Sequence, residues 1–178
     1  MQEKGNSANL LLIGDGATGK TSIVNVRMGQ GFSEEEQTTL GLDFVSKDVN
    51  PKTNKSFQYN LKVWDTAGQE RFHSMTQSFY KQANGMIICF DVTRKKTFDS
   101  VKRWINICED NCEDGMPIIL VGNKCDLEDD RQIMAEDAEQ VASELDIPYF
   151  EVSAKTNLNI NSLFDEMIDL IYLKSFAS

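Results

Sequence analysis

Eight consecutive residues, 14–21, constrain the fold more than any other part of the chain. They read GDGATGKT and match the pattern G-x-x-x-x-G-K-[ST] in full. The motif follows a short apolar run at 10–13 and precedes a helical stretch at 22–24. A strand, a glycine-rich loop and a helix in this order form a backbone cradle for phosphate. The sequence therefore predicts a phosphate-binding loop where a strand ends and a helix begins.

The parts of this motif have separate chemical roles. Glycine lets backbone N–H groups wrap around a β-phosphate, and the helix N-terminus adds partial positive charge. Lys20 is expected to reach the β- and γ-phosphates, and Thr21 to ligate Mg²⁺ through its hydroxyl. The residues expected to line the phosphate site are Asp15, Gly16, Ala17, Thr18, Gly19, Lys20, Thr21 and Ser22. The alternative, a glycine-rich turn without a ligand, is disfavoured by the complete motif in its required setting.

Short apolar runs alternate along the chain with segments of helical period. Residues 10–13, 86–90 and 118–121 are nearly continuous apolar runs, as in parallel strands covered on both faces. Residues 41–49 and 56–65 flank a turn-forming stretch and predict an antiparallel hairpin at one edge. The alternation predicts an α/β fold: a doubly wound, mostly parallel six-stranded sheet with one antiparallel edge strand and helices on both faces.

Three later segments carry apolar residues at helical spacing. Their faces, which we expect to pack in the core, comprise Phe98, Val101, Trp104, Ile105 and Cys108; then Met134, Ala138, Val141, Ala142 and Leu145; then Ile160, Leu163, Phe164, Met167, Ile168 and Ile171. Ligands of doubly wound sheets bind beyond the carboxyl ends of the strands, which is where the motif at 14–21 would lie.

Composition narrows the class of protein. The 178 residues suit a single domain with one core. A formal net charge of −10 argues against a nucleic-acid binder and against attraction to an anionic membrane. The four cysteines are accompanied by one histidine, so reduced thiols are expected rather than zinc or disulfides. Without a membrane-length apolar window or a leader of signal-peptide type, a soluble intracellular protein is expected.

A polar motif after the run at 118–121 bears on which base accompanies the phosphates. It reads NKCD, and its last residue is Asp126. This carboxylate can accept hydrogen bonds from N1–H and the exocyclic amine of guanine, whereas adenine has no donors there, and a site of this kind rejects the wrong base strongly. Asn123 and the stem of Lys124 are expected to brace the base and the loop. Alone the motif is weak, because an exposed turn looks the same.

A second short motif strengthens the guanine prediction. Ser153, Ala154 and Lys155 follow the last predicted strand, 149–152, and are placed to close over the other side of the base. Since the phosphate loop, NKCD and this triplet each stand at a strand end, they are expected to meet at one edge of the sheet.

Residues suited to act on a terminal phosphate follow a fourth predicted strand. Asp65 ends the predicted strand 56–65 and can hold the magnesium shell. The amide of Gly68 can approach the γ-phosphate because no side chain obstructs it, and Gln69 can orient the attacking water. Thr39 is placed to complete the metal shell when a γ-phosphate is present; the alternative is a solvated loop threonine.

With these motifs in place, the chain resembles the Rab family of Ras-like small GTPases over about residues 9–173. The segments that carry the resemblance are TLGLDF at 39–44, LKVW at 61–64 with DTAGQERF at 65–72, the stretch from HSMT at 73–76 to Lys81, MIICFDVT at 86–93 and SVKRW at 100–104. The resemblance implies a P-loop NTPase fold of the small G-protein type. It implies a protein that binds GTP and GDP with Mg²⁺, hydrolyses GTP slowly without an activating protein, and acts as a molecular switch in vesicle trafficking.

The resemblance also assigns roles along the chain. It places Thr39 in a first switch and 66–80 in a second, and it places Phe32 beside the guanine. An exchange factor, an activating protein and effectors are expected to bind residues 33–44 and 64–80. Phe44, Trp64 and Phe79 are implied to form an exposed apolar triad that effectors contact; the alternative is that Phe44 and Trp64 belong to the core.

Several positions depart from the family pattern. Ala17 stands where glycine is usual, Gly16 where many relatives have serine, and Glu36 where many have a tyrosine over the phosphates. The acidic run at 34–36 is expected to weaken closure of the first switch; the alternative is a solvated loop. The family motifs supply no arginine in cis, so an activating protein is expected to insert one.

The organisation expected for the chain is a flexible N-terminus at 1–8, a GTPase domain at 9–173 and the start of a C-terminal tail at 174–178. A monomer is expected. The last residues lack the cysteine that prenylation uses, so attachment to the cytosolic face of an intracellular membrane is implied by the resemblance alone. Two rivals stay open: an ATP-using P-loop enzyme such as a small kinase, and a Rab-shaped nucleotide-binding module with impaired hydrolysis.

Overall fold

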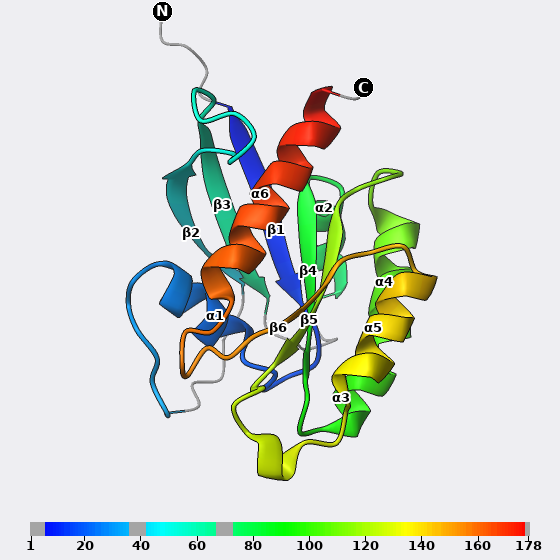
Figure 1. The fold of residues 1–178 in the computed structure, drawn as a ribbon. Helices are drawn as coiled ribbons and strands as arrows, with labels where there is room; N and C mark the ends of the chain where they lie inside the picture. Colours follow the sequence, from blue (N-terminus) through cyan, green and yellow to red (C-terminus); the bar gives the residue numbers. More distant parts are fainter. Residues whose placement is uncertain (1–5, 36–41, 67–72, 177–178) are drawn as a thin grey trace, which may run out of the picture.

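The computed structural model describes residues 6–35, 42–66 and 73–176, which form one sheet with helices on both faces (Figure 1). Six strands lie in the order β2-β3-β1-β4-β5-β6. Their bounds are β1 Ser7–Ile13, β2 Leu42–Val49, β3 Tyr59–Thr66, β4 Gly85–Asp91, β5 Ile118–Asn123 and β6 Tyr149–Glu151. β2 pairs antiparallel with β3, and the other pairings are parallel. The predicted fold class is confirmed, including the antiparallel edge strand.

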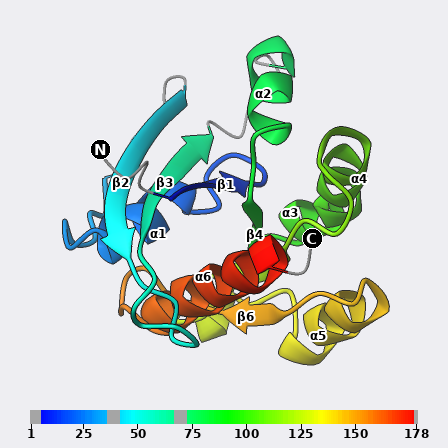
Figure 2. The same ribbon diagram turned by 90° about the horizontal axis from the view of Figure 1, so that it is seen from above.

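The helices divide between the two faces of the sheet. They are α1 Lys20–Arg27, α2 His73–Tyr80, α3 Lys95–Asp99, α4 Val101–Asn111, α5 Ala135–Glu144 and α6 Ile160–Phe176, with a 3-10 turn, η2, at Glu128–Asp130. α1 and α6 cover one face, and α4 and α5 lie on the other, as Figure 2 shows. Within the described ranges, no helix combines the length and the apolar character that a membrane crossing requires.

Strand β1 shows why a sheet covered on both faces has a continuous apolar sequence. Leu10 and Leu12 pack with α1 and α6, whereas Leu11 and Ile13 pack in the layer that contains α4 and α5. All four side chains are 0% exposed. Neighbouring residues of a strand point to opposite faces, so each of them meets a core.

The predicted helical faces are mostly buried. The face of α6 is confirmed in full, since even Ile171, its most exposed member, is only 4% exposed. The prediction for Met134 is wrong: its side chain is 58% exposed. Met134 precedes the first residue of α5 with an extended backbone, at φ −74° and ψ 149°, so the helical spacing does not extend to it.

The other two helical faces differ from the prediction in smaller ways. The face from Phe98 to Cys108 spans two helices, α3 and α4, which Ser100 joins at helical dihedral angles, φ −76° and ψ −13°. The stripe therefore stays on one side of the sheet. Phe98 is half-buried, as are Val141 and Leu145 on α5.

The turn between β2 and β3 packs against α6. The backbone N–H and the hydroxyl of Thr53 each donate to Oδ1 of Asp169, at 3.1 Å. Nδ2 of Asn54 donates to the hydroxyl of Tyr172 at 2.7 Å. The predicted hairpin is confirmed, but β3 begins at Tyr59 because the preceding residues belong to this docked turn.

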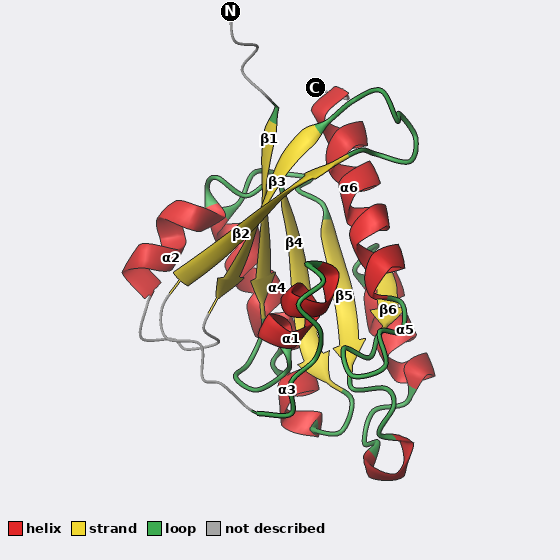
Figure 3. Cartoon of the chain, turned by 90° about the vertical axis from the view of Figure 1, so that its left-hand side faces the viewer, coloured by secondary structure: helices red, strands yellow, loops and turns green. Residues whose placement is uncertain are grey.

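The strand order positions the site. From β1 the chain runs to β2 and β3 on one side of the sheet, and from β4 it runs to β5 and β6 on the other. Figure 3 shows β1, β4 and β5 ending at the same edge. Loops diverge at this edge between β1 and β4, and ligands of doubly wound sheets bind at such a point.

Candidate nucleotide-binding site

The loop at residues 14–21, called the P-loop below, needs glycine at positions 14 and 19. Gly14 and Gly19 have φ angles of 143° and 90°. A β-carbon on Gly14 would lie 2.1 Å from the carbonyl oxygen of Cys89, and one on Gly19 would lie 2.2 Å from Nδ2 of Asn123. The loop therefore packs directly on the ends of β4 and β5, without room for a side chain at either point.

Ala17 adopts a conformation that favours glycine. Its φ is 59°, in the left-handed region, although it carries a β-carbon. For an L-residue this conformation costs about 1–2 kcal/mol. The departure from glycine noted in the sequence is therefore a source of backbone strain in the P-loop.

Lys20 lies folded into the P-loop at the start of α1. Its side chain is buried, and Nζ donates to the carbonyl oxygens of Gly14 at 3.1 Å and Asp15 at 2.7 Å. A third contact joins Nζ to the hydroxyl of Thr18 at 3.4 Å. Burial lowers the pKa of Lys20, and the carboxylates of Asp65 and Asp15 oppose this shift. The ammonium is thus held where the loop amides would receive phosphate, and Ser22 follows half-buried in the first turn of α1.

Thr21 and Asp65 come together from the start of α1 and the end of β3. The hydroxyl of Thr21, in the first turn of α1, donates to Oδ2 of Asp65 at the end of β3. Asp65 is 7% exposed, and the hydroxyl of the next residue, Thr66, is bonded to the carbonyl oxygen of Leu12 at 2.7 Å. A hydroxyl and a carboxylate oxygen are hard donors of the kind that Mg²⁺ prefers. The donor set therefore fits a magnesium ion.

Asn123 joins three loops. Its side chain is 1% exposed, and Nδ2 donates to the carbonyl oxygen of Thr18 at 2.9 Å. Its Oδ1 accepts the backbone N–H of Ala154 at 3.3 Å. The predicted bracing residue thus connects the P-loop, the end of β5 and the loop after β6.

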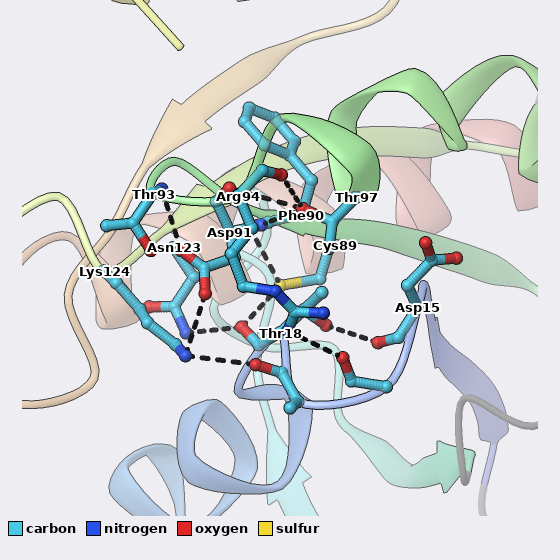
Figure 4. Close-up of polar contacts among 12 residues, drawn as sticks. Asp15, Thr18, Cys89, Phe90, Asp91, Thr93, Arg94, Thr97, Asn123 and Lys124 are labelled. Atoms are coloured by element: carbon cyan, nitrogen blue, oxygen red, sulfur yellow. Dashed lines mark hydrogen bonds and ion pairs between the residues drawn. The ribbon is translucent and has the colours of Figure 1, made fainter. Parts of the chain in front are cut away.

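Lys124 connects the P-loop with a residue that sequence reasoning missed (Figure 4). Its Nζ donates to the carbonyl oxygen of Ala17 at 3.1 Å and lies 2.9 Å from Oδ2 of Asp91. Asp91 is fully buried at the end of β4, and its Oδ1 accepts the N–H and hydroxyl of Thr93 at 2.9 and 2.7 Å. The sequence signal that could have identified Asp91 is an acidic residue at the end of a continuous apolar run.

Asp126 is oriented by the loop after β6. The hydroxyl of Ser153 donates to Oδ1 of Asp126 at 2.6 Å, and it accepts the backbone N–H of Thr156 at 3.1 Å. Ser153 is fully buried. The NKCD and SAK motifs therefore form one unit, in which a buried serine holds the carboxylate.

The loop after α1 lies near the same unit. Lys155 and Glu34 form an ion pair at 3.0 Å between two exposed side chains. This contact raises the pKa of Lys155. Phe32, in the same loop, is 40% exposed. The acidic run therefore begins with a residue that already has a cationic partner.

Asp15, which was predicted to line the phosphate site, also makes contacts with α4 that sequence reasoning missed. Its Oδ2 accepts the hydroxyl of Ser100 at 2.7 Å, and its Oδ1 accepts the indole N–H of Trp104 at 2.9 Å and Nη2 of Arg103 at 3.1 Å. Trp104 was expected only in the core, and its ring is indeed buried. The missed signal was its polar N–H, which a buried indole needs to satisfy. This carboxylate ties the P-loop to the start of α4.

Three aromatic rings form a row across β2, β3 and α2. The ring centroids of Phe44 and Trp64 lie 4.6 Å apart, as do those of Trp64 and Phe79. Phe44 is 46% exposed, while Trp64 and Phe79 are half-buried. Phe44 is therefore not a core residue.

Some predicted residues lie outside the described part of the chain. They are Thr39, Gly68, Gln69 and Glu36.

Comparison with known proteins agrees with this geometry. The model of the Ras family matches residues 9–173. Ras-related protein Rab-13 of Bos taurus is 38% identical, covering 93% of this chain and 80% of that protein. GTP-binding protein Rab-3D of Rattus norvegicus is 38% identical, covering 91% and 73%. Ras-related protein SEC4 of Candida albicans is 37% identical, covering 93% and 77%. The chain therefore belongs to the Ras family and is a Rab-type small GTPase, a GTP hydrolase that acts as a molecular switch in vesicle trafficking.

Proposed function

We propose that the site at the carboxyl edge of the sheet binds GTP and GDP together with Mg²⁺, with the phosphates on the P-loop and the base between NKCD and SAK. The observation that carries this assignment is the placement of Asp126. Ser153 holds its carboxylate at 2.6 Å, beside Asn123, which is itself bonded to the P-loop. A phosphate cradle and an acceptor for guanine N–H groups thus belong to one connected network.

The phosphates would lie along residues 15–22. Backbone amides and the N-terminus of α1 supply partial positive charge, and Lys20 supplies a full charge. In place of its present bonds to the carbonyls of Gly14 and Asp15, the ammonium would bond phosphate oxygens. Because it is already buried in the loop, little reorganisation accompanies that exchange.

Thr21, Asp65 and Thr39 are the residues that would hold the metal. When bound, Mg²⁺ neutralises charge on the β- and γ-phosphate oxygens. The hydroxyl of Thr21 and the carboxylate of Asp65 contact each other in the described structure, so one metal ion could contact both oxygens. Thr39 would join them from the first switch.

Hydrolysis would use residues of the second switch. Gln69 would orient the water that attacks the γ-phosphorus in line, with its carbonyl accepting and its amide donating. The amide of Gly68 would donate to the γ-phosphate. Loss of that phosphate would remove its contacts with Gly68 and Thr39, so that both switches would relax.

Base recognition would rest on Asp126. The carboxylate would accept the N1–H and the exocyclic amine of guanine, whereas adenine would leave it without these partners. Lys124, Ala154, Lys155 and Phe32 would surround the base. An ATP-using enzyme has no use for such an acceptor, so this feature favours guanine over the kinase alternative.

Partner proteins would bind the surfaces at 33–44 and 64–80. The row of Phe44, Trp64 and Phe79 is an apolar cluster at the border of these two surfaces, which suits contact with an effector. An exchange factor and an activating protein would bind there as well. We further propose a monomer with a GTPase domain at about 9–173, on the cytosolic face of an intracellular membrane where a C-terminal tail is lipidated. The bounds predicted for the flanking segments, 1–8 and 174–178, need correction, because β1 already begins at Ser7 and α6 continues to Phe176.

The experiment that tests the function is analysis of the nucleotide that copurifies with the protein. The protein is purified with Mg²⁺ and denatured, and the released nucleotide is resolved by ion-exchange chromatography. Near-stoichiometric GDP supports guanine binding and completed hydrolysis. Retained GTP would point to the module with impaired hydrolysis, and ATP or ADP would refute the guanine assignment.

A competition assay adds a matched control for the base. GTP should displace labelled GDP from the parent protein far better than ATP does. Asp126→Asn should lose this preference, while Asp129→Asn, a substitution in the exposed η2 turn, should keep it. Equal competition by ATP and GTP in the parent would refute the role of Asp126.

A further inference from the structure

Arg94 lies in the loop between β4 and α3, and its side chain extends to the P-loop (Figure 4). Its Nη1 donates to the carbonyl oxygen of Gly16 at 3.2 Å. Gly16 is exposed, and a β-carbon built on it would meet nothing within 4 Å. A guanidinium therefore stands at an open part of the phosphate loop, where the family motifs provide none.

Among the residues that the structure describes, Arg94 lacks the carboxylate partner that two other cations near the P-loop have. Lys124 pairs with Asp91, and Arg103 pairs with Asp15. Across residues 6–35, 42–66 and 73–176, no carboxylate forms an ion pair with Arg94. In a chain with a net charge of −10, an exposed guanidinium without a carboxylate is well suited to an anionic ligand.

Both ends of this contact are held in place. The backbone N–H of Arg94 donates to the carbonyl oxygen of Asp91 at 3.0 Å, and the buried hydroxyl of Thr97 donates to the carbonyl oxygen of Arg94 at 2.7 Å. On the P-loop side, Asp15 is bonded to α4 through Trp104. The backbone on both sides of the contact is therefore fixed, which favours the preorganisation that electrostatic catalysis requires.

Lys20 and Arg94 donate to successive carbonyl oxygens of the P-loop. Lys20 donates to the carbonyl oxygens of Gly14 and Asp15, and Arg94 donates to that of Gly16. Guanidinium has five N–H donors in a planar fork that matches phosphate oxygens. Nη1 has the bond to Gly16, and the rest of the fork is available to a phosphate.

We propose that Arg94 is a catalytic residue for GTP hydrolysis, an arginine that this chain supplies in cis to the terminal phosphate. The proposal rests on the proposed nucleotide site. The water oxygen forms a bond to the γ-phosphorus while the bond from that phosphorus to the β–γ bridging oxygen breaks. The electron pair stays on GDP, and the proton lost by the water is released with inorganic phosphate. Arg94 remains protonated and stabilises the charge that develops on the phosphoryl oxygens.

The test is single-turnover hydrolysis of GTP with Mg²⁺, comparing the parent with Arg94→Ala and Arg94→Lys. The matched control is Lys96→Ala, which removes an exposed cation of α3 and leaves the P-loop contact intact. We expect Arg94→Ala to slow hydrolysis about 10- to 100-fold, the effect of losing a charge-assisted hydrogen bond, and to leave GDP affinity within about twofold. Arg94→Lys should retain part of the rate, and Lys96→Ala all of it.

Two results would overturn the proposal. If the parent and Arg94→Ala hydrolyse GTP at equal rates, Arg94 has no catalytic role. Equal losses of GTP and GDP affinity with an unchanged rate would show that Arg94 only supports the loop, and a thermal melt of each variant identifies unfolding. These results differ from failure of the proposed function, in which the parent itself would bind no guanine nucleotide or leave GTP intact.

Discussion

Replacing Ala17 with glycine should stabilise the protein, although an alanine-to-glycine substitution lowers the free energy of unfolding at most positions. Ala17 has φ 59°, which costs an L-residue about 1–2 kcal/mol. Glycine removes this strain but gives the unfolded chain more freedom, which costs about 0.4–1 kcal/mol. The difference is a gain of roughly 0.5–1 kcal/mol in the free energy of unfolding. In a domain of this size that corresponds to about 1–4 °C in Tm.

The assay is denaturant unfolding of the parent and Ala17→Gly at a fixed, saturating concentration of GDP and Mg²⁺. GDP affinity is measured separately, so that its contribution to the free energy of unfolding can be subtracted. Ala138→Gly is the matched control with the opposite sign. Ala138 is 0% exposed inside α5, so glycine there loses helix propensity and a buried methyl group, about 1–2 kcal/mol together. If Ala17→Gly destabilises the protein as Ala138→Gly does, the strain at Ala17 is refuted.

Three further predictions concern the site. Trp104→Phe removes the indole donor to Asp15 and should speed GDP release about 5- to 10-fold, as followed with a fluorescent GDP; an unchanged release rate would show that Ser100 and Arg103 hold Asp15 without it. Ser153→Ala should weaken GDP binding about tenfold in calorimetry because Asp126 loses the hydroxyl that orients it, and full affinity would contradict that role. Gln69→Leu should bind GTP normally but hydrolyse it much more slowly, and equal single-turnover rates would refute the positioning of water by Gln69.

The loops were predicted from the sequence together with the edge of the sheet at which they meet. A glycine motif after an apolar run, and polar motifs after two later runs, converge because parallel strands end at the same edge. The contacts of Asn123 with the P-loop and of Ser153 with Asp126 agree with that convergence. Asp91 was missed because a single acid at a strand end resembles an ordinary turn residue, and its burial follows only from packing.

The sequence by itself determined the fold class, the phosphate loop and the guanine motifs, because each depends on local spacing and on which strand a motif follows. Only the tertiary structure decided which side chains from distant segments meet. Asp15 reaches Trp104 on α4, and Arg94 reaches Gly16 across the end of β4. It also decided that Met134 lies outside α5 and that Ala17 is strained. These facts depend on backbone angles and on long-range approach, which residue spacing along a chain does not encode.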